Sequence, residues 1–261
     1  MPVTSLRDSY SATAAAWGRE PMHIYGKLAT ELLARAPVPL AGQRVLDLGC
    51  GTGAASLPAT AAGARVVGVD IALGMLLAGR TVRPPGAAGD ALALPFPAAV
   101  FDTVVAAFCL NHFPAPAVAV REAARVLQPA GHLLASTFAR QDEHPVRDAV
   151  DHALAERGWT APAWYAGVRA AMASWGTKSA AAAVIEQGGM RAVQVEQGDV
   201  EFPDLDARAL VRWRLDMPSA APFVASLDRQ ERARLEDRAL ALIGDAPPLV
   251  RTVIFIVARA H

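Results

Sequence analysis

Short apolar runs alternate with helix-like stretches between residues 43 and 138. Runs rich in β-branched residues predict buried strands, and apolar positions three and four residues apart predict amphipathic helices. The expected strands cover residues 44–49, 64–70, 101–110 and 132–138, with a short one ending at residue 90, and the expected helices cover residues 52–62, 71–81 and 117–127. Because strands and helices alternate, we expect a parallel sheet covered by helices on both faces.

The pattern becomes mainly helical on either side of this region. A further helix over residues 178–187 and strands over residues 190–202 and 250–260 are also expected. The mainly helical segments are residues 1–42, 141–176 and 204–248. We therefore expect one α/β domain over residues 1–261, in which residues 43–138 form the ligand-binding core and the three helical segments act as lids.

Composition and charge limit the class of partner. The chain has 25 basic and 25 acidic residues, whereas nucleic-acid binders usually carry a basic surplus that neutralises phosphates. Although 53% of the residues are apolar, no stretch is long and clean enough to cross a bilayer, and no signal peptide is visible. Cys50 and Cys109 are too few for a disulfide scaffold or a zinc site. We expect a cytoplasmic protein without a nucleic-acid, membrane or metal partner, and its oligomeric state is open.

The strongest local signal is the sequence VLDLGCGTG at residues 45–53, where a predicted strand turns into a predicted helix. Gly49, Gly51 and Gly53 have no Cβ, so a ligand can approach the backbone closely, and a helix that begins near Thr52 presents free N–H groups there. Asp70 ends the next strand, where an acid can accept hydrogen bonds from both hydroxyls of a ribose. These features predict a pocket for an adenosine-type ligand at the carboxyl edge of the sheet.

The same glycines also match the dinucleotide fingerprint G-x-G-x-x-A, through Gly49, Gly51 and Ala54. Asp47 argues against a nicotinamide cofactor, because a carboxylate at the mouth of the turn repels a pyrophosphate but suits an ammonium group. In addition, the chain after residue 138 does not build a second mononucleotide-binding half. An NAD-dependent oxidoreductase is therefore the less favoured interpretation.

Five motifs occur in a fixed order between residues 45 and 138. They are VLDLGCGTG (45–53), VVGVDIALGML (66–76), GDALALPF (89–96), FDTVVAAFCLNHF (101–113) and EAARVLQPAGHLLASTF (122–138). Together they resemble the class I S-adenosylmethionine-dependent methyltransferases, and above all the small-molecule branch around the ubiquinone- and menaquinone-biosynthesis C-methyltransferases and natural-product enzymes. The resemblance implies a Rossmann-like sheet of seven strands with the last one antiparallel, helical lid insertions, and S-adenosyl-L-methionine as the cofactor of the core at residues 43–138.

The resemblance also implies roles for individual residues. Asp47 and Gly49 would hold the ammonium group of the methionine part, Gly51 and Gly53 would give the cofactor room, and Asp70 would bind the ribose. The other implied cofactor contacts are Ile71 and Met75 beside the adenine, Asp90 accepting from the adenine amino group with Ala91 next to it, Phe108, Cys109 and Leu110 along the methionine arm, and Tyr10 closing over the cofactor.

The best candidate for a catalytic base is His112. It lies just beyond the fourth predicted strand, where this fold presents its acceptor, and the ordinary pKa of histidine near 6.5 suits proton transfer at neutral pH. A histidine here could equally bond a loop carbonyl or form part of the pocket wall. Asn111 could orient the acceptor or the loop, and His23 is a weaker candidate in the N-terminal helical segment.

Tryptophan and tyrosine are absent from residues 43–138 and gather in the helical segments. Such side chains combine a large apolar face with one polar atom, which suits a pocket that grips a small ligand and orients it. The alternative is that the rings only join the lid helices to the core. The aromatic candidates for the acceptor pocket are Trp17, Tyr25, Trp164, Tyr165 and Trp213.

The function expected from these observations is S-adenosylmethionine-dependent methyl transfer to a small, largely apolar or aromatic metabolite, in secondary metabolism. The methylated atom could be O, N or C. An enzyme of the same fold that keeps the cofactor without transferring methyl, such as a cyclase or decarboxylase, is the main alternative.

Overall fold

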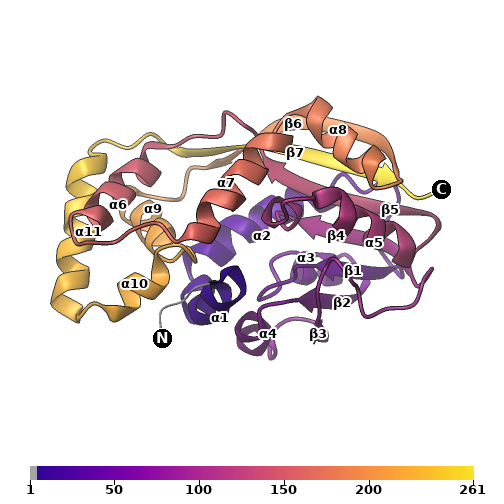
Figure 1. The fold of residues 1–261 in the computed structure, drawn as a ribbon, viewed down its shortest axis with the longest axis horizontal. Coiled ribbons are helices and arrows are strands. Elements are labelled where there is room, and N and C mark those ends of the chain that lie inside the picture. The colour runs from indigo at the N-terminus through magenta and orange to yellow at the C-terminus, as the bar shows by residue number, and fades with distance from the viewer. Residues whose placement is uncertain (1–4) are drawn as a thin grey trace.

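A seven-stranded sheet forms the centre of the computed structural model, which describes residues 5–261 (Figure 1). The strands are β1 Arg44–Leu48, β2 Arg65–Asp70, β3 Gly86–Ala88, β4 Phe101–Ala107, β5 Leu127–Phe138, β6 Arg191–Phe202 and β7 Leu249–Arg259. They lie in the order β3-β2-β1-β4-β5-β7-β6, with β7 antiparallel to both of its neighbours. The predicted Rossmann-like sheet with an antiparallel last strand is thereby confirmed. Residues 1–4 of the expected N-terminal lid lie outside the described residues.

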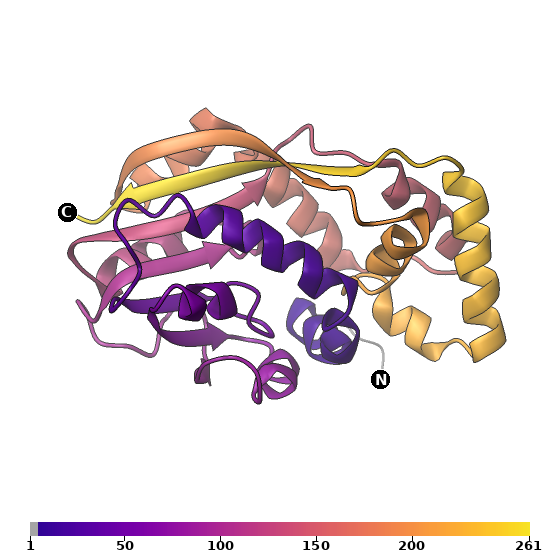
Figure 2. The same cartoon turned by 180° about the vertical axis from the view of Figure 1, so that it is seen from behind.

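Helices cover both faces of the sheet because successive strand residues point to opposite sides. Val45 packs in the cluster that contains Leu28 of α2, and Leu46 packs in the cluster that contains Ile185 of α8. Figure 1 shows α5 and α8 on the near face, and Figure 2 shows α2 and α3 across the opposite one. The bounds of these helices are α2 Glu20–Leu33, α3 Ser56–Ala61, α5 Pro116–Val126 and α8 Lys178–Gln187.

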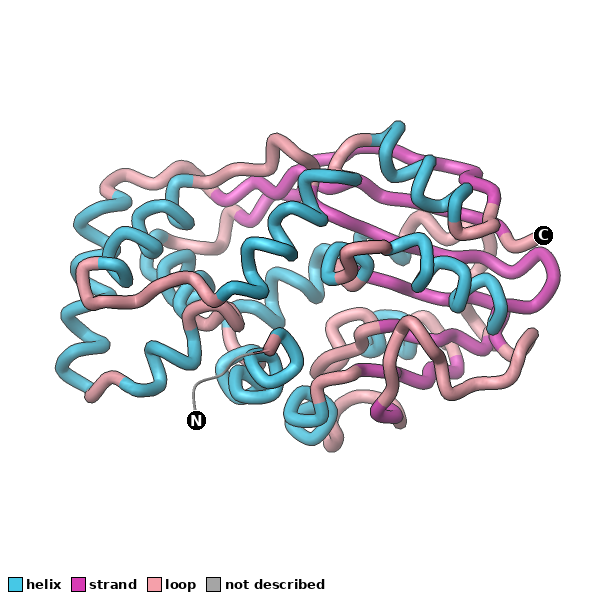
Figure 3. The backbone as a smooth tube through the Cα atoms, in the orientation of Figure 1, coloured by secondary structure: helices cyan, strands magenta, loops and turns pink. Residues whose placement is uncertain are grey.

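The other helices gather around the end of the sheet where the parallel strands finish (Figure 3). They are α1 Leu6–Trp17, α4 Leu73–Gly79, α6 Pro145–Ala155, α7 Ala163–Trp175, α9 Ala207–Leu215, α10 Ala221–Ser226 and α11 Arg229–Ile243. The last three lie in the connection between β6 and β7. These two strands pair as far as Phe202 opposite Leu249, where the chain leaves the sheet. The helical segments thus lie where a ligand site of an open α/β sheet is expected. Their action as lids stays a prediction.

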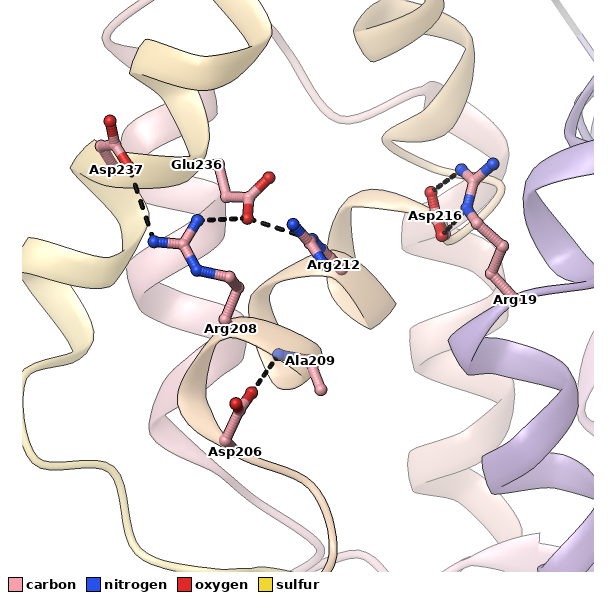
Figure 4. A network of polar contacts seen from close by, with 8 residues as sticks. All are labelled: Arg19, Asp206, Arg208, Ala209, Arg212, Asp216, Glu236 and Asp237. Carbon is pink, nitrogen blue, oxygen red and sulfur yellow. Dashed lines mark hydrogen bonds and ion pairs between the residues drawn. The ribbon is translucent and has the colours of Figure 1, made fainter.

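Arginine–carboxylate pairs join the helices of this group on their outer side (Figure 4). Arg208 and Arg212 of α9 both donate to one carboxylate oxygen of Glu236 in α11, at 2.6 and 3.1 Å. Arg19, between α1 and α2, donates to both oxygens of Asp216 just after α9. The arginine side chains are largely exposed, so each pair contributes only about 0.2–1 kcal/mol.

Several element boundaries differ from the sequence-based expectation, among them the start of β5 at Leu127 instead of residue 132, and two of these differences matter for function. The helix expected over residues 52–62 begins only at Ser56, because Gly53 has a φ of +110° and cannot belong to a right-handed helix. The strand expected over residues 101–110 ends at Ala107, because Phe108 has a φ of +54°, which turns the chain out of the sheet into the short 3₁₀ helix η1 Leu110–His112. Both differences lie at the candidate site.

Within residues 5–261, none of the helices has both the length and the apolar character needed to traverse a bilayer.

Candidate active site

The glycine-rich turn follows β1 and is held against the end of β2 by backbone hydrogen bonds. The N–H groups of Gly49 and Cys50 both donate to the carbonyl of Val69, at 2.8 and 3.1 Å. Gly49 has a φ of +71°, and a Cβ there would lie 3.0 Å from the Cβ of Cys109. The position therefore requires glycine, because its backbone is left-handed and the loop after β4 crosses directly over it. The absence of a side chain brings the ends of β1, β2 and β4 close together.

Asp47 of β1 is buried beneath this turn. One of its carboxylate oxygens accepts a hydrogen bond from the hydroxyl of Ser56 at 2.5 Å, at the first residue of α3. Burial raises the pKa of Asp47 to about 6, and the hydrogen bond from Ser56 offsets only part of this effect. A buried carboxyl group without a cationic partner is a favourable place for the ammonium group of a ligand.

Asp70 ends β2 and closes the turn from the other side. Its two carboxylate oxygens accept from the N–H groups of Gly51 and Ala72, at 2.8 and 2.7 Å. Burial raises the pKa of Asp70, while these two backbone donors lower it. Each oxygen keeps a further lone pair, so the carboxylate can still accept hydrogen bonds from ligand hydroxyls.

His112 lies in η1 and is bonded through both ring nitrogens. Nδ1 is 3.1 Å from the carbonyl of Cys109, which can only accept, so Nδ1 carries the proton. Nε2 is therefore an acceptor and is 2.8 Å from the hydroxyl of Tyr10 in α1, which donates to it. Burial lowers the pKa of His112 and raises that of Tyr10, so the imidazole is neutral and the phenol protonated at neutral pH.

A cavity of about 450 Å³ joins these groups to the lid helices. Asp47, Asp70 and His112 lie in its wall at the sheet edge, and α1, α6, α7 and α9 contribute the opposite wall. The predicted cofactor residues that line it are Tyr10, Asp47, Gly49, Gly51, Asp70, Ile71, Met75, Asp90, Ala91, Phe108 and Cys109. The predicted acceptor residues that line it are Trp17, Tyr25, Asn111, Trp164, Tyr165 and Trp213.

Three predicted site residues lie outside the cavity wall. Gly53 packs against the side chain of Arg83, where a Cβ would lie 2.7 Å from the arginine Cβ. Leu110 is fully buried in the apolar core on the α5 side of the sheet. His23 is on α2, where its Nε2 is 2.9 Å from a carboxylate oxygen of Asp204 on the surface. These residues lie around the cavity and not in its wall, and their roles at the site stay predictions.

Aromatic rings form one connected wall between the sheet edge and the lids. Tyr25 stacks on Trp17, with ring centroids 5.1 Å apart, and meets Phe108 edge-on at 5.5 Å. Tyr10 lies 5.6 Å from Trp17 and 5.4 Å from the His112 ring. These rings therefore line the cavity and also join the N-terminal helices to the core. That they bind an acceptor stays a prediction.

Several residues of the wall were not expected from the sequence. Arg214 of α9 and Arg251 of β7 are buried cationic residues, and Arg251 is paired with Asp142, which follows β5. The sequence around an arginine does not reveal whether its side chain lines a pocket or faces solvent. The pairing of these two arginines across more than 60 residues of chain becomes visible only in the fold.

Comparisons with known proteins agree with this geometry. Residues 46–135 match the family described as "Methyltransferase domain". A demethylmenaquinone methyltransferase of Corynebacterium kroppenstedtii is 44% identical over 100 residues, which are 38% of this chain and 44% of that relative. The match thus spans less than half the length of either protein.

Solved structures with the same fold cover more of the chain. A methyltransferase in complex with the Trm112 methyltransferase activator of Haloferax volcanii superposes with a TM-score of 0.60 at 21% identity, over 98% of this chain and 97% of that one. The [4+2]-cyclase SpnF superposes with a TM-score of 0.53 at 20% identity, over 88% of this chain and 79% of that one. These likenesses show the fold alone, and the cyclase illustrates that the fold does not fix the reaction. The sheet order and the family match over residues 46–135 together support a class I S-adenosylmethionine-dependent methyltransferase.

Proposed function

We propose that the protein binds S-adenosyl-L-methionine at the carboxyl edge of the sheet and transfers its methyl group to a small, largely apolar or aromatic molecule enclosed by the lid helices. The observation that carries this proposal is the single cavity in which Asp47, Asp70 and His112 face aromatic side chains of the lids. The relative from Corynebacterium kroppenstedtii is named a demethylmenaquinone methyltransferase, which supports a small-molecule acceptor here. An O, N or C acceptor and a role in secondary metabolism belong to this proposal.

The charges of the sheet edge suit a cationic cofactor. When bound, S-adenosylmethionine supplies an activated methyl group on a sulfonium centre. Asp47, Asp70 and Asp90 line the adjacent part of the cavity, and all three are carboxyl groups. Asp47 lies beside the glycine turn, where the ammonium group of the ligand would offset the cost of burying the carboxylate. Asp70 ends β2 and would accept hydrogen bonds from hydroxyl groups, and Asp90 follows β3 and would accept one from an amino group.

His112 and Tyr10 form the group that would accept a proton from the acceptor. The Tyr10 hydroxyl already donates to Nε2, and its oxygen can accept a hydrogen bond from the acceptor at the same time. A proton can then pass to Nε2 through this hydroxyl without rearrangement of the histidine, which Cys109 holds in one tautomer. The remaining work of the chain is to orient the acceptor and exclude water, which Trp17 and Tyr25 favour by covering the site.

Binding measurements on Asp70→Asn test the cofactor assignment. The variant loses charge-assisted hydrogen bonds to the ribose, so the affinity for S-adenosylhomocysteine should fall about tenfold or more. Asp102→Asn is the matched control, because Asp102 pairs with Arg44 at the opposite edge of the sheet and should leave the affinity unchanged. Tight binding of NAD by the unaltered protein, or equal affinities in both variants, would contradict the assignment.

Mass spectrometry tests the reaction itself. The protein should carry or bind S-adenosylhomocysteine and add one methyl group to a member of a panel of small aromatic acceptors. Cofactor binding with rearranged, decarboxylated or cyclised products and no methylated product would favour the cyclase or decarboxylase alternative.

A further inference from the structure

The cavity is divided by charge along its length. The sheet edge contributes Asp47, Asp70 and Asp90 to the wall, whereas the basic residues of the wall come from α1, α6, α9 and β7. These basic residues are Arg7, Arg147, Arg214 and Arg251. A cationic cofactor explains the acidic residues. Each of the four arginines has a carboxylate within 4 Å, so a ligand site among them depends on which guanidinium group keeps a free donor.

Arg214 is the most deeply buried of these arginines, with 6% of its surface exposed. All the hydrogen bonds of its guanidinium group come from Nη2, which donates to both carboxylate oxygens of Asp151 at 3.0 and 3.2 Å and to the hydroxyl of Tyr165 at 3.1 Å. Nε is buried and finds no acceptor within residues 5–261. Asp151 therefore engages only one of the three guanidinium nitrogens.

Arg251 offers a useful contrast in the same wall. Its guanidinium group donates from Nε and Nη2 to the two oxygens of Asp142, at 3.1 and 2.5 Å, and lies 3.8 Å above the ring of Phe138. This is the side-by-side arrangement in which an arginine is satisfied by one carboxylate. Arg251 thus forms a structural ion pair with Asp142, while Arg214 keeps N–H groups that are not hydrogen-bonded to Asp151 or Tyr165.

Other polar atoms close to Arg214 in sequence or in the wall also lack partners. They are Nε1 of Trp213 and Oγ of Ser219, which have no hydrogen-bond partner within residues 5–261 and belong to residues that line the cavity. Each of these atoms can donate a hydrogen bond. A buried donor without an acceptor costs about 1–3 kcal/mol, so an anionic ligand that reached these donors would relieve that cost.

We propose that the methyl acceptor carries a carboxylate group, which Arg214 and the neighbouring donors of α9 and the turn after it bind. This inference rests on the proposed function and narrows its substrate class. The carboxylate would fix one end of the acceptor at the lids, and its aromatic or apolar body would lie along Tyr25 and Tyr165 with the reacting atom toward His112. The charge of Arg214 also reaches Tyr25. Burial raises the pKa of Tyr25 to about 12, and the positive charges of Arg251 and Arg214 both lower it.

Paired probes of similar shape, one with an anionic carboxylate and one with a neutral amide, test the proposal. Binding of 4-hydroxybenzoate and of 4-hydroxybenzamide is measured by calorimetry or ligand-observed NMR, on the full chain with and without S-adenosylhomocysteine. The carboxylate should bind about tenfold or more tightly than the amide, as expected for a charge-assisted bond to a buried arginine. Arg214→Gln should bring the ratio of the two affinities close to one.

Arg212→Gln is the matched control, because Arg212 belongs to the same helix, pairs with Glu236 on the outer surface and does not line the cavity (Figure 4). It should keep the preference for the carboxylate. If Arg214→Gln fails to fold, Trp213→Phe removes one of the unpartnered donors while keeping an aromatic ring, and it should lower the preference at least about threefold.

The outcomes separate this inference from the proposed function. Equal binding of the two probes, stronger binding of the amide, no binding of the carboxylate at millimolar concentration, or an unchanged preference in Arg214→Gln would overturn it. A protein that prefers the carboxylate but does not bind S-adenosylhomocysteine would uphold the anion site and refute the methyltransferase proposal.

Discussion

At the scale of single residues, Asp47 links the cofactor site to pH. A carboxyl group whose pKa is raised in the folded protein binds more protons than in the unfolded chain, so the ligand-free protein loses stability as the pH rises toward 6. A bound ammonium group needs the ionised carboxylate and removes that cost. Asp70, whose pKa is also raised, acts in the same direction.

Cofactor affinity should therefore increase with pH. With the pKa of Asp47 at about 6, only about a tenth of this carboxyl is ionised at pH ~5, so the dissociation constant of S-adenosylhomocysteine should be about tenfold higher there than at pH ~8. Calorimetric titrations across this range measure the slope. Asp47→Asn should flatten most of it, whereas Asp90→Asn should weaken binding and keep the slope. The interpretation fails if Asp47→Asn retains the full pH dependence.

His112 should act on turnover and leave cofactor binding nearly unchanged. Removal of a general base costs about 10²–10⁴ in rate, so His112→Ala should lower kcat by an amount in that range. Because burial lowers the pKa of His112, the activity of the unaltered protein should fall only at pH values below the ordinary pKa of histidine, where the imidazole becomes protonated.

His132→Gln is the control for this experiment, since His132 begins the part of β5 that pairs with β4 and does not line the cavity. Its kcat and pH profile should match those of the unaltered protein. A loss well below tenfold in His112→Ala, together with an unshifted pH profile, would make His112 a part of the pocket wall only.

At the scale of elements, we expect the docking of α1 on α4 to control access to the proposed cofactor site. Gly74 of α4 lies directly against the backbone of Ser11, and its N–H donates to the Ser11 hydroxyl at 3.3 Å. Tyr10 is on the same helix and bonds His112. The position of α1 therefore decides whether the cavity is covered.

Gly74→Ala should loosen this contact, because the new Cβ would lie 2.7 Å from the Cα of Ser11. We expect faster hydrogen exchange of the amides of residues 6–17 and faster dissociation of S-adenosylhomocysteine. Gly167→Ala in α7 is the control: no atom lies within 4 Å of its Cβ, so the change should stabilise the protein by about 0.5–1 kcal/mol and leave α1 protected. Equal protection of α1 in both variants would show that α1 does not depend on this contact.

At the scale of the whole molecule, the periodicity of the core predicted the sheet well. The apolar runs around Val45 and Val104 are buried on both faces, which produces the continuous pattern that identifies parallel strands. The acids Asp47 and Asp70 were predictable for a related reason, since charged residues at the ends of such strands have few structural explanations.

The buried arginine of the cavity wall, Arg214, and the turn at Phe108 could not be predicted from hydrophobic periodicity. Arg214 and its partner Asp151 are 63 positions apart, and neither residue type reveals burial. The left-handed backbone of Phe108 also gives no signal, because its sequence continues the strand pattern. Pairings between distant helices and local backbone reversals depend on the completed fold, so they emerge only from the structure.

The insertion of α9–α11 between two paired strand ends affects how this part of the protein can change in evolution. The chain departs at Phe202 and returns at Leu249, and these residues face each other in the sheet register. The whole of α9–α11 could be replaced by a shorter or longer segment without moving the strands, because both ends of the segment are already held together. Recombination at these two points would exchange the part of the wall that contains Arg214 and preserve the turn around Asp47. New acceptors can thus arise in this lineage while the methyl donor stays the same.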